Sequence, residues 1–185
     1  YPVVFSKVEP EPSIKTVKKC LEITNESSFD LVIGFGGGSA IDVAKKVAME
    51  LDLPKIMIPT TAGTGSEVTH ESVLKVEGKK RAFVDKRLTA EVAIVDPSLM
   101  MTMPKKLIAS SGIDALAHAV ESCECKKGNE LTRALAHGAY SLIRDNIRKA
   151  TSYDKDAISS MALASLMAGM AFGNSGTTLC HALTY

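Results

Sequence analysis

The sequence has no strong excess of charge of either sign and no long basic stretch. Its 185 residues include 22 lysines and arginines against 21 aspartates and glutamates. Proteins that bind nucleic acid or an anionic membrane surface usually concentrate lysine and arginine in runs or patches. The composition therefore predicts a small-molecule ligand, with neither nucleic acid nor a membrane as partner.

Cysteine is scarce, and its spacing fits neither a disulfide scaffold nor a zinc motif. The four cysteines are Cys20, Cys123, Cys125 and Cys180. Only one residue separates Cys123 from Cys125, where a redox or zinc motif has two. We therefore expect reduced thiols and a cytoplasmic protein.

The sequence also lacks a signal peptide and a membrane-spanning run. The longest apolar stretch, residues 161–172, is about half of the roughly 20 residues that cross a bilayer, so we interpret it as a buried helix. With 45% hydrophobic residues the chain can fill a core. It begins with Tyr1 rather than methionine and ends at Tyr185 inside a motif, and we expect a piece of a longer protein.

Three consecutive glycines, Gly36 to Gly38, follow an apolar run and lead into an amphipathic segment. The pattern predicts a strand, a tight turn and a helix. Glycine lets the backbone approach a pyrophosphate, the first N–H groups of the helix point at the anion, and Ser39 adds a hydroxyl donor. We interpret this stretch as a phosphate site. It is neither the dinucleotide fingerprint nor a P-loop, and a plain strand-to-helix turn is the alternative.

A second polar loop, residues 59–69, follows the next expected strand at residues 55–58. Hydroxyl residues and glycines alternate along it. Open α/β sheets bind ligands at the carboxyl ends of parallel strands, and both loops would lie at that edge. The loop therefore suits phosphate or ribose, and a solvated surface loop is the alternative.

The order of expected elements divides the chain into two halves. Helices at 13–24 and 39–51, a strand at 31–33, buried strands at 55–58 and 91–95, and a hairpin at 72–85 make the first half α/β. From Pro104 onward the pattern is helical, with helices at 105–124, 130–149 and 155–172 and another beginning near Thr177. The fold class is thus α/β followed by all-α, with two domains that meet near residues 97–104.

Asp114 and His118 lie four residues apart in the first helix of the second half, so both project from one face. Their neighbours are apolar, and a divalent cation would satisfy a buried carboxylate together with a neutral imidazole. A simple Asp–His hydrogen bond is the alternative. Glu121 continues the same face, and we interpret it as a solvated helix charge rather than a ligand or an acceptor behind one.

His181 lies near the start of the last helix, with Tyr185 one turn further on. With Asp114 and His118 it would make an Asp and two-His set with open positions, although a single histidine of this kind is more often a core residue. His70 and His137 do not belong to a comparable set of candidate ligands, and we interpret both as surface residues.

Four motifs in this order resemble the iron-containing (group III) alcohol dehydrogenase family. The resemblance runs from about Asp30 to the last residue. The motifs are GGGSAIDVAK at 36–45, PTTAGTGSEVT at 59–69, AIVDP at 93–97 and GIDALAHAVE at 112–121.

The resemblance implies a Rossmann-like domain, residues 1–100, that binds NAD or NADP, and a helical domain, residues 101–185, that holds one divalent metal, Fe(II) or Zn(II). Catalysis would take place in the cleft between them. The implied metal ligands are Asp114, His118 and His181, and the family's fourth ligand would lie beyond the end of this chain.

The resemblance also implies roles at the cofactor. Gly37, Gly38 and Ser39 would hold the pyrophosphate, and Asp42 would lie on the nicotinamide-ribose side. Lys80 would reach the nicotinamide ribose. The adenosine and phosphate path would be lined by Thr60, Thr61 and Thr64.

The implied reaction is hydride transfer between NAD(P) and a small alcohol or aldehyde, or a hydroxyacid and oxoacid. Tyr185 stands where many members carry a second histidine, which resembles the hydroxyacid-oxoacid transhydrogenase branch. A zinc-dependent relative similar to glycerol dehydrogenase, maleylacetate reductase or dehydroquinate synthase is one alternative, and a nucleotide-binding fragment without turnover is another. A homodimer is the family's usual assembly.

Overall fold

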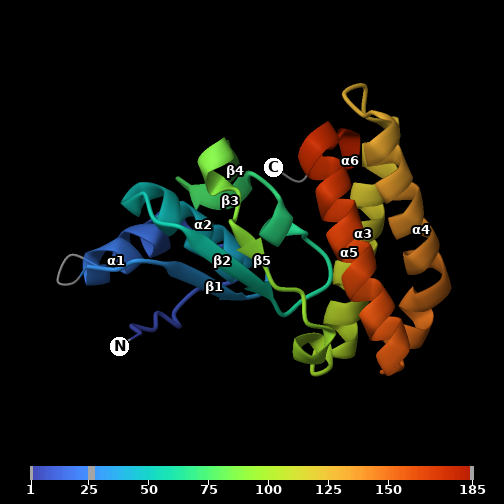
Figure 1. The fold of residues 1–185 in the computed structure, drawn as a ribbon, viewed down its shortest axis with the longest axis horizontal. Coiled ribbons are helices and arrows are strands. Elements are labelled where there is room, and N and C mark those ends of the chain that lie inside the picture. The colour runs from blue at the N-terminus through green and yellow to red at the C-terminus, as the bar shows by residue number, and fades with distance from the viewer. Residues whose placement is uncertain (1, 25–27, 184–185) are drawn as a thin grey trace.

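The computed structural model describes residues 2–24 and 28–183. It has two parts, a small α/β part that contains the N-terminus and a bundle of long helices, which lie side by side (Figure 1). This order confirms the predicted fold class of α/β followed by all-α.

The α/β part is built on a three-stranded parallel sheet in the order β1-β2-β5. Strands β1 (Val32–Gly36) and β2 (Lys55–Pro59) pair over their whole length, and β5 (Val92–Ala93) adds a short edge. Helix α2 (Gly38–Leu51) follows β1 directly and packs on β1 and β2. Helix α1 (Ile14–Thr24) lies against α2. The strand, glycine turn and helix predicted from the sequence are therefore present.

In the part of the chain that the structure describes, helices cover only one face of this sheet. On the other face Ile33 and Phe35 of β1 are 57% and 59% exposed, and Val92 and Ile94 at β5 are both 45% exposed. The prediction that residues 91–95 form a buried strand is therefore wrong. The strand is shorter, and no described helix packs over it.

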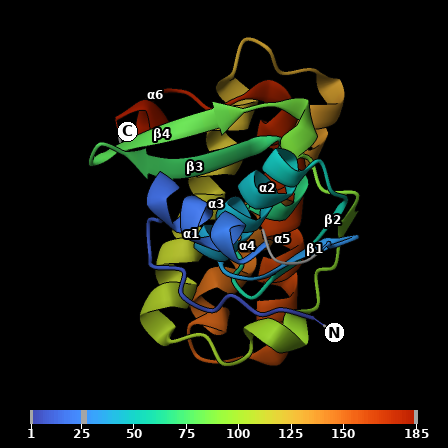
Figure 2. The same ribbon diagram turned by 90° about the vertical axis from the view of Figure 1, so that its left-hand side faces the viewer.

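A β-hairpin runs across the top of the view in Figure 2, beside α2. Its strands β3 (Glu71–Val76) and β4 (Lys79–Val84) are antiparallel and joined by a turn at Glu77 and Gly78. Gly78 has a φ of +81°, a left-handed conformation that glycine adopts without strain. Strand β3 packs against α2, and hairpin residues line a cavity together with Gly38 and Ser39 of the glycine turn.

The helical part consists of α3 (Lys105–Glu124), α4 (Glu130–Ala150), α5 (Lys155–Ser175) and the short α6 (Leu179–Ala182). Local signals define their starts. Asn129 and Thr132 form a reciprocal capping box at α4, and the Asp154 carboxylate accepts from the Ala157 N–H at α5. Small residues such as Ala164 and Ala168 are fully buried in α5, which lets the three long helices approach closely.

Helix α5 is the one described helix that is long and apolar enough to cross a membrane by length and composition. It is longer than the apolar run seen in the sequence, because residues 155–160 precede that run in the helix and residues 173–175 follow it. Yet 61% of its most apolar window is buried within the protein. This burial agrees with the prediction of a buried core helix.

The loop between β2 and β3 joins the two parts through close backbone contacts. A Cβ on Gly63 would lie 2.7 Å from Cβ of Ser111 in α3, and a Cβ on Gly65 would lie 2.6 Å from Cα of Gly169 in α5. Only glycine permits this approach. Ser66, Glu67 and Thr69 of the same loop are buried, so the alternative of a solvated surface loop is wrong.

Candidate functional site

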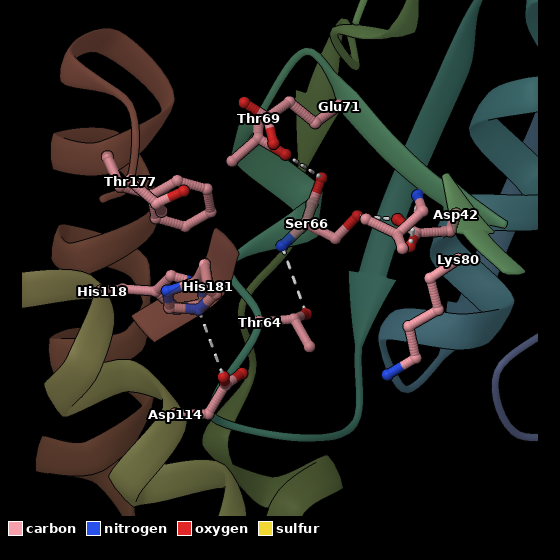
Figure 3. A pocket seen from close by; sticks show the side chains of 12 residues that line it. Asp42, Thr64, Ser66, Thr69, Glu71, Lys80, Asp114, His118, Thr177 and His181 are labelled. Atoms are coloured by element: carbon pink, nitrogen blue, oxygen red, sulfur yellow. Dashed lines mark hydrogen bonds and ion pairs between the residues drawn. The ribbon is translucent and has the colours of Figure 1, made fainter. Parts of the chain in front are cut away.

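Asp114, His118 and His181 come together where α3 meets α6 (Figure 3). Asp114 and His118 lie one turn apart on α3, and His181 reaches them from α6. One ligand atom from each lies within 4.8 Å of the others. The His181 Nε2 is 3.7 Å from the Asp114 Oδ1. The structure thus gathers the three residues that the resemblance names as metal ligands.

His118 lies in an aromatic stack and is only 6% exposed. Its ring is 4.1 Å from that of Phe172 and 4.3 Å from that of His181, centroid to centroid. Burial lowers the pKa of His118 to about 4, so its imidazole is neutral at pH 7. Its Nδ1 is buried with no hydrogen-bond partner among the described residues.

The charges of Asp114 and His181 support each other. The contact with Asp114 raises the pKa of His181, and its bond to Glu121 acts in the same direction despite burial. Burial alone would raise the pKa of Asp114, but the nearby His181 and His118 outweigh it and lower the pKa. Asp114 is therefore ionised, which a metal-binding carboxylate must be.

Glu121 is buried, with 2% exposure, and it is not a solvated helix charge. Its carboxylate accepts from the backbone N–H of Thr178 at 2.9 Å and of Cys180 at 2.5 Å, and it contacts the His181 Nδ1 at 2.7 Å. Burial favours a higher pKa, but these hydrogen bonds outweigh it and lower the pKa of Glu121 to about 2. The sequence interpretation failed because these partners come from a segment more than 50 residues away.

The chemistry and spacing of this donor set fit a divalent cation. A carboxylate and two imidazoles are ligands that Fe(II) and Zn(II) both accept. Ligand atoms at about 2.0–2.2 Å from one ion are at most about 4.4 Å apart, so the observed separation within 4.8 Å needs only small side-chain rotations. The neutral state of His118 agrees with a role as ligand.

A cavity of about 220 Å³ opens between the two parts of the protein at this cluster. Asp114, His118, His181 and Phe172 line its helical side. Residues of the α/β part line the other side, namely Asp42, Thr64, Ser66, Thr69, Glu71, Val73 and Lys80. The side chains around it are visible in Figure 3.

A second cavity of about 150 Å³ lies at the glycine turn. Gly38 and Ser39 line it at the N-terminus of α2, where N–H groups have no partner within the helix. A Cβ on Gly38 would lie 2.6 Å from Cγ2 of Thr64, so glycine allows the two polar loops to touch. The two cavities share lining residues, namely Asp42, Thr64, Val73 and Lys80. They therefore adjoin one another.

Glu11 faces the second cavity together with two lysines. Its carboxylate lies 2.6 Å from Nζ of Lys75 and 2.8 Å from Nζ of Lys80. Glu11 has a φ of +52°, which is uncommon outside glycine and often marks a functional position. The sequence interpretation did not consider Glu11 or Lys75.

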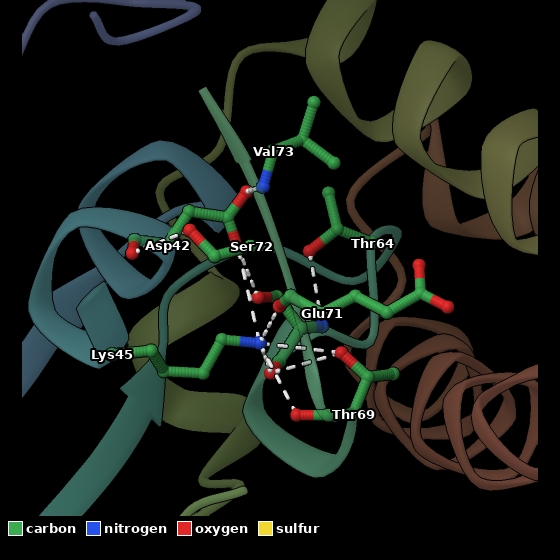
Figure 4. Close-up of polar contacts among 8 residues, drawn as sticks. Asp42, Lys45, Thr64, Thr69, Glu71, Ser72 and Val73 are labelled. Atoms are coloured by element: carbon green, nitrogen blue, oxygen red, sulfur yellow. Dashed lines mark hydrogen bonds and ion pairs between the residues drawn. The ribbon is translucent and has the colours of Figure 1, made fainter. Parts of the chain in front are cut away.

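Lys45 is buried, and its hydrogen bonds hold the second polar loop in place (Figure 4). Its ammonium group donates to the backbone oxygen of Ser66 at 2.7 Å, to that of Thr69 at 3.2 Å, and to that of Glu71. Burial lowers the pKa of Lys45 to about 8, although nearby Asp42 and Glu67 oppose this shift. The same buried group thus fixes three successive parts of the loop.

Asp42 ties the two loops and the hairpin together. Its carboxylate accepts from the Ser66 hydroxyl and from the Val73 N–H, the latter at 3.0 Å. Burial raises the pKa of Asp42, against the effect of Lys45. Asp42 therefore borders both cavities while it also organises their walls.

The other residues expected at the cofactor are placed less uniformly. Thr64 and Lys80 line both cavities, whereas Gly37, Thr60 and Thr61 line neither. Thr60 and Gly37 are still close to the turn, because the Thr60 N–H donates to the Gly36 oxygen and Gly37 precedes the first turn of α2. Phe172, which stacks on His118, carried no recognisable signal in the sequence.

The remaining sequence expectations concern other histidines, Tyr185 and the cysteines. His137 is exposed on α4, as expected, and His70 is half-buried in the loop before β3. Tyr185 lies outside the described residues. All four cysteines are free thiols, in agreement with the prediction.

Family models match both parts of the chain. Residues 1–97 match the model described as iron-containing alcohol dehydrogenase, and residues 108–185 match the C-terminal model of the Fe-containing alcohol dehydrogenase family. The chain belongs to the iron-containing alcohol dehydrogenase family.

Similar proteins include a long-chain-alcohol dehydrogenase 1 from Geobacillus thermodenitrificans, which is 42% identical over 98% of this chain and 52% of its own length. The crystal structure of an iron-containing alcohol dehydrogenase from Thermotoga maritima has a TM-score of 0.95 at 40% identity, over 99% of this chain and 56% of that one. A sulfoacetaldehyde reductase from Bifidobacterium kashiwanohense, solved in complex with NAD+, has a TM-score of 0.93 at 36% identity, over 98% of this chain and 54% of that one. The chain spans about half the length of the relatives it matches.

Proposed function

We propose that this protein is a metal-dependent oxidoreductase that transfers a hydride between NAD(P) and a small alcohol or aldehyde. One observation carries the proposal. The cavity at the glycine turn adjoins the cavity at the Asp114, His118 and His181 cluster, and Asp42, Thr64 and Lys80 border both. An anion-binding turn and a cation site thus share one continuous lining, as a dinucleotide and a polarised substrate oxygen require.

The metal would be held by Asp114, His118 and His181, with Fe(II) expected from the family and Zn(II) compatible with the same ligands. When bound, the cation supplies Lewis acidity that polarises the oxygen of an alcohol or carbonyl substrate. The neutral imidazole of His118 and the ionised carboxylate of Asp114 are already in the protonation states that such a site needs.

The α/β part would bind and orient the dinucleotide. Gly37, Gly38 and Ser39 offer backbone and hydroxyl donors at the start of α2 for the pyrophosphate. Lys80 and Asp42 would contact the nicotinamide ribose. Thr60, Thr61 and Thr64 would follow the adenosine and phosphate path, of which Thr64 has the clearest structural support because it lines both cavities.

The two parts would act as separate domains, residues 1–100 for the cofactor and 101–185 for the metal. Close contacts of Gly63 and Gly65 with α3 and α5 support a fixed cleft between them. A homodimer in the cytoplasm stays our expectation from the resemblance and the composition.

The test is oxidation of NADH and NADPH with a panel of small aldehydes and oxoacids. The protein is stripped of metal and then assayed with Fe(II) or Zn(II) added back. Metal-dependent turnover that is lost together with metal content in Asp114→Ala supports the proposal. Unchanged metal content and turnover in Asp114→Ala would refute the ligand assignment, and NAD(H) binding without any metal-dependent turnover would favour a non-catalytic nucleotide-binding role.

A further inference from the structure

We propose that Glu121 is a positioning residue that sets the tautomer and the orientation of His181 for metal binding. The proposal rests on the metal centre proposed above and goes beyond it, because Glu121 is not itself one of the three ligands. It assigns a task to the most completely hydrogen-bonded carboxylate beside the cluster.

The Glu121 carboxylate holds both the backbone and the ring of His181. Its Oε1 accepts from the N–H of Cys180 at 2.5 Å and from the N–H of His181 at 3.3 Å. Its Oε2 accepts from the N–H of Thr178 at 2.9 Å and contacts the ring Nδ1 of His181 at 2.7 Å. A single side chain thus anchors the start of α6 and one edge of the imidazole ring.

This geometry determines which ring nitrogen carries the proton. An ionised carboxylate can only accept hydrogen bonds, so Nδ1 of His181 must be the donor. In the neutral ring the lone pair is then on Nε2, the nitrogen that faces Asp114 at 3.7 Å. A carboxylate behind a histidine in this way fixes the tautomer of a ligand and increases its basicity.

Glu121 also explains how one helix can organise a site drawn from two segments. Asp114, His118 and Glu121 all belong to α3. Two of them face the cation site directly, and the third holds the ligand that arrives from α6. The position of His181 relative to the other two ligands therefore depends on Glu121.

The experiment compares Glu121→Gln with Glu124→Gln in cobalt titrations. Glutamine keeps the shape of glutamate but replaces one acceptor oxygen with an NH2 group, which can only donate. It therefore cannot accept from the Cys180 N–H, the Thr178 N–H and the Nδ1–H of His181 all at once, so the hold on His181 is weakened in either orientation of the amide. Glu124 is exposed three residues further along α3 and serves as the matched control. We expect Co²⁺ affinity, measured from its visible absorption, to fall about 10- to 100-fold in Glu121→Gln and to stay unchanged in Glu124→Gln.

A second measurement on the unmodified chain keeps the test independent of how the variant folds. Two-bond ¹H–¹⁵N spectra of histidine-labelled protein loaded with Zn²⁺ should show His181 protonated on Nδ1. Protonation on Nε2, or wild-type affinity in a folded Glu121→Gln, would overturn the role of Glu121. Failure of the wild type to bind either Co²⁺ or Zn²⁺ would instead refute the proposed metal centre, and Glu121 with it.

Discussion

Replacing Gly169 by alanine should weaken the junction between the polar loop and the helical bundle. A Cβ at Gly169 in α5 would lie 2.9 Å from the Cα of Gly65, 2.9 Å from Cγ2 of Val68 and 3.0 Å from the Gly65 oxygen. Two of these three atoms are backbone, and Gly65 has a φ of +59°. The added methyl therefore cannot be accommodated by a change of rotamer alone.

Gly138 in α4 provides a matched control. A Cβ there would lie 2.3 Å from Cε of Met167 and 3.7 Å from its Sδ. The clash is with the end of a flexible side chain, which can move aside. Both glycines lie inside α-helices, where alanine is favoured over glycine by about 0.5–1 kcal/mol. That gain is common to both variants and cancels in the comparison.

The expected difference in stability follows from the cost of overpacking. Extra methyl groups in a close-packed site cost about 1–3 kcal/mol, and Gly138→Ala should avoid most of this. With a difference of about 2 kcal/mol, Gly169→Ala should melt roughly 4–8 °C below Gly138→Ala. Urea unfolding followed by circular dichroism supplies the free energy of unfolding for each variant.

Nucleotide affinity is a second readout, because the loop also lines the cavity beside the glycine turn. We expect weaker NAD(H) binding in Gly169→Ala and unchanged binding in Gly138→Ala. Equal stability and equal nucleotide affinity in the two variants would show that the contact between Gly65 and Gly169 does not hold the loop.

Three further perturbations test other parts of the site. Lys45→Met should cost about 3–5 kcal/mol because it leaves buried acceptors and Asp42 without their cation. Lys46→Met loses an ion pair with the half-exposed Glu50 and a cation–π contact with Phe83, and should cost about 1–2 kcal/mol in the same urea assay. Glu11→Gln should lower the KM for the dinucleotide by about two- to fivefold, because it releases Lys75 and Lys80 to contact the dinucleotide. A higher KM would show that Glu11 assists binding instead. In metal-free protein the free energy of unfolding should fall as the pH drops from about 6.5 to 4. Burial lowers the pKa of His118 to about 4, so on acidification the histidine is protonated in the unfolded chain before it is protonated in the folded one. A pH dependence that persists in His118→Phe would assign the effect to another group.

Local signals were sufficient to locate most helices and strands. The interpretation of residues 105–124 as a helix agrees with α3 (Lys105–Glu124), and the expected helix at 130–149 is one residue shorter than α4 (Glu130–Ala150). Periodicity and capping residues lie within each element, so the sequence carries them directly. The end of α5 was missed by three residues, because Gly173, Asn174 and Ser175 continue the helix against usual preference.

The sequence predicted only part of the cluster of Asp114, His118 and His181. The spacing of Asp114 and His118 places them on one helix face in any sequence, but nothing local brings His181 to that face. Its approach depends on the packing of α5 against α3 and on the bonds that Glu121 makes to the start of α6. The residue types alone offered His181 as a third ligand with a core histidine as the alternative, and the resemblance to a family favoured the ligand. No signal distinguished a buried Glu121 from the exposed Glu124 one turn further on.

The sequence pattern did not show whether the glycines of the polar loop serve ligand binding or packing. Alternating glycines and hydroxyls suggested a backbone open to phosphate. Gly63 and Gly65, however, face α3 and α5, where their missing side chains admit Ser111 and Gly169. These two glycines therefore serve the packing of the cleft, and the loop can present Thr64 to both cavities because its backbone is fixed to the bundle behind it. In the function proposed above, the orientation of the dinucleotide relative to the metal would depend on that attachment.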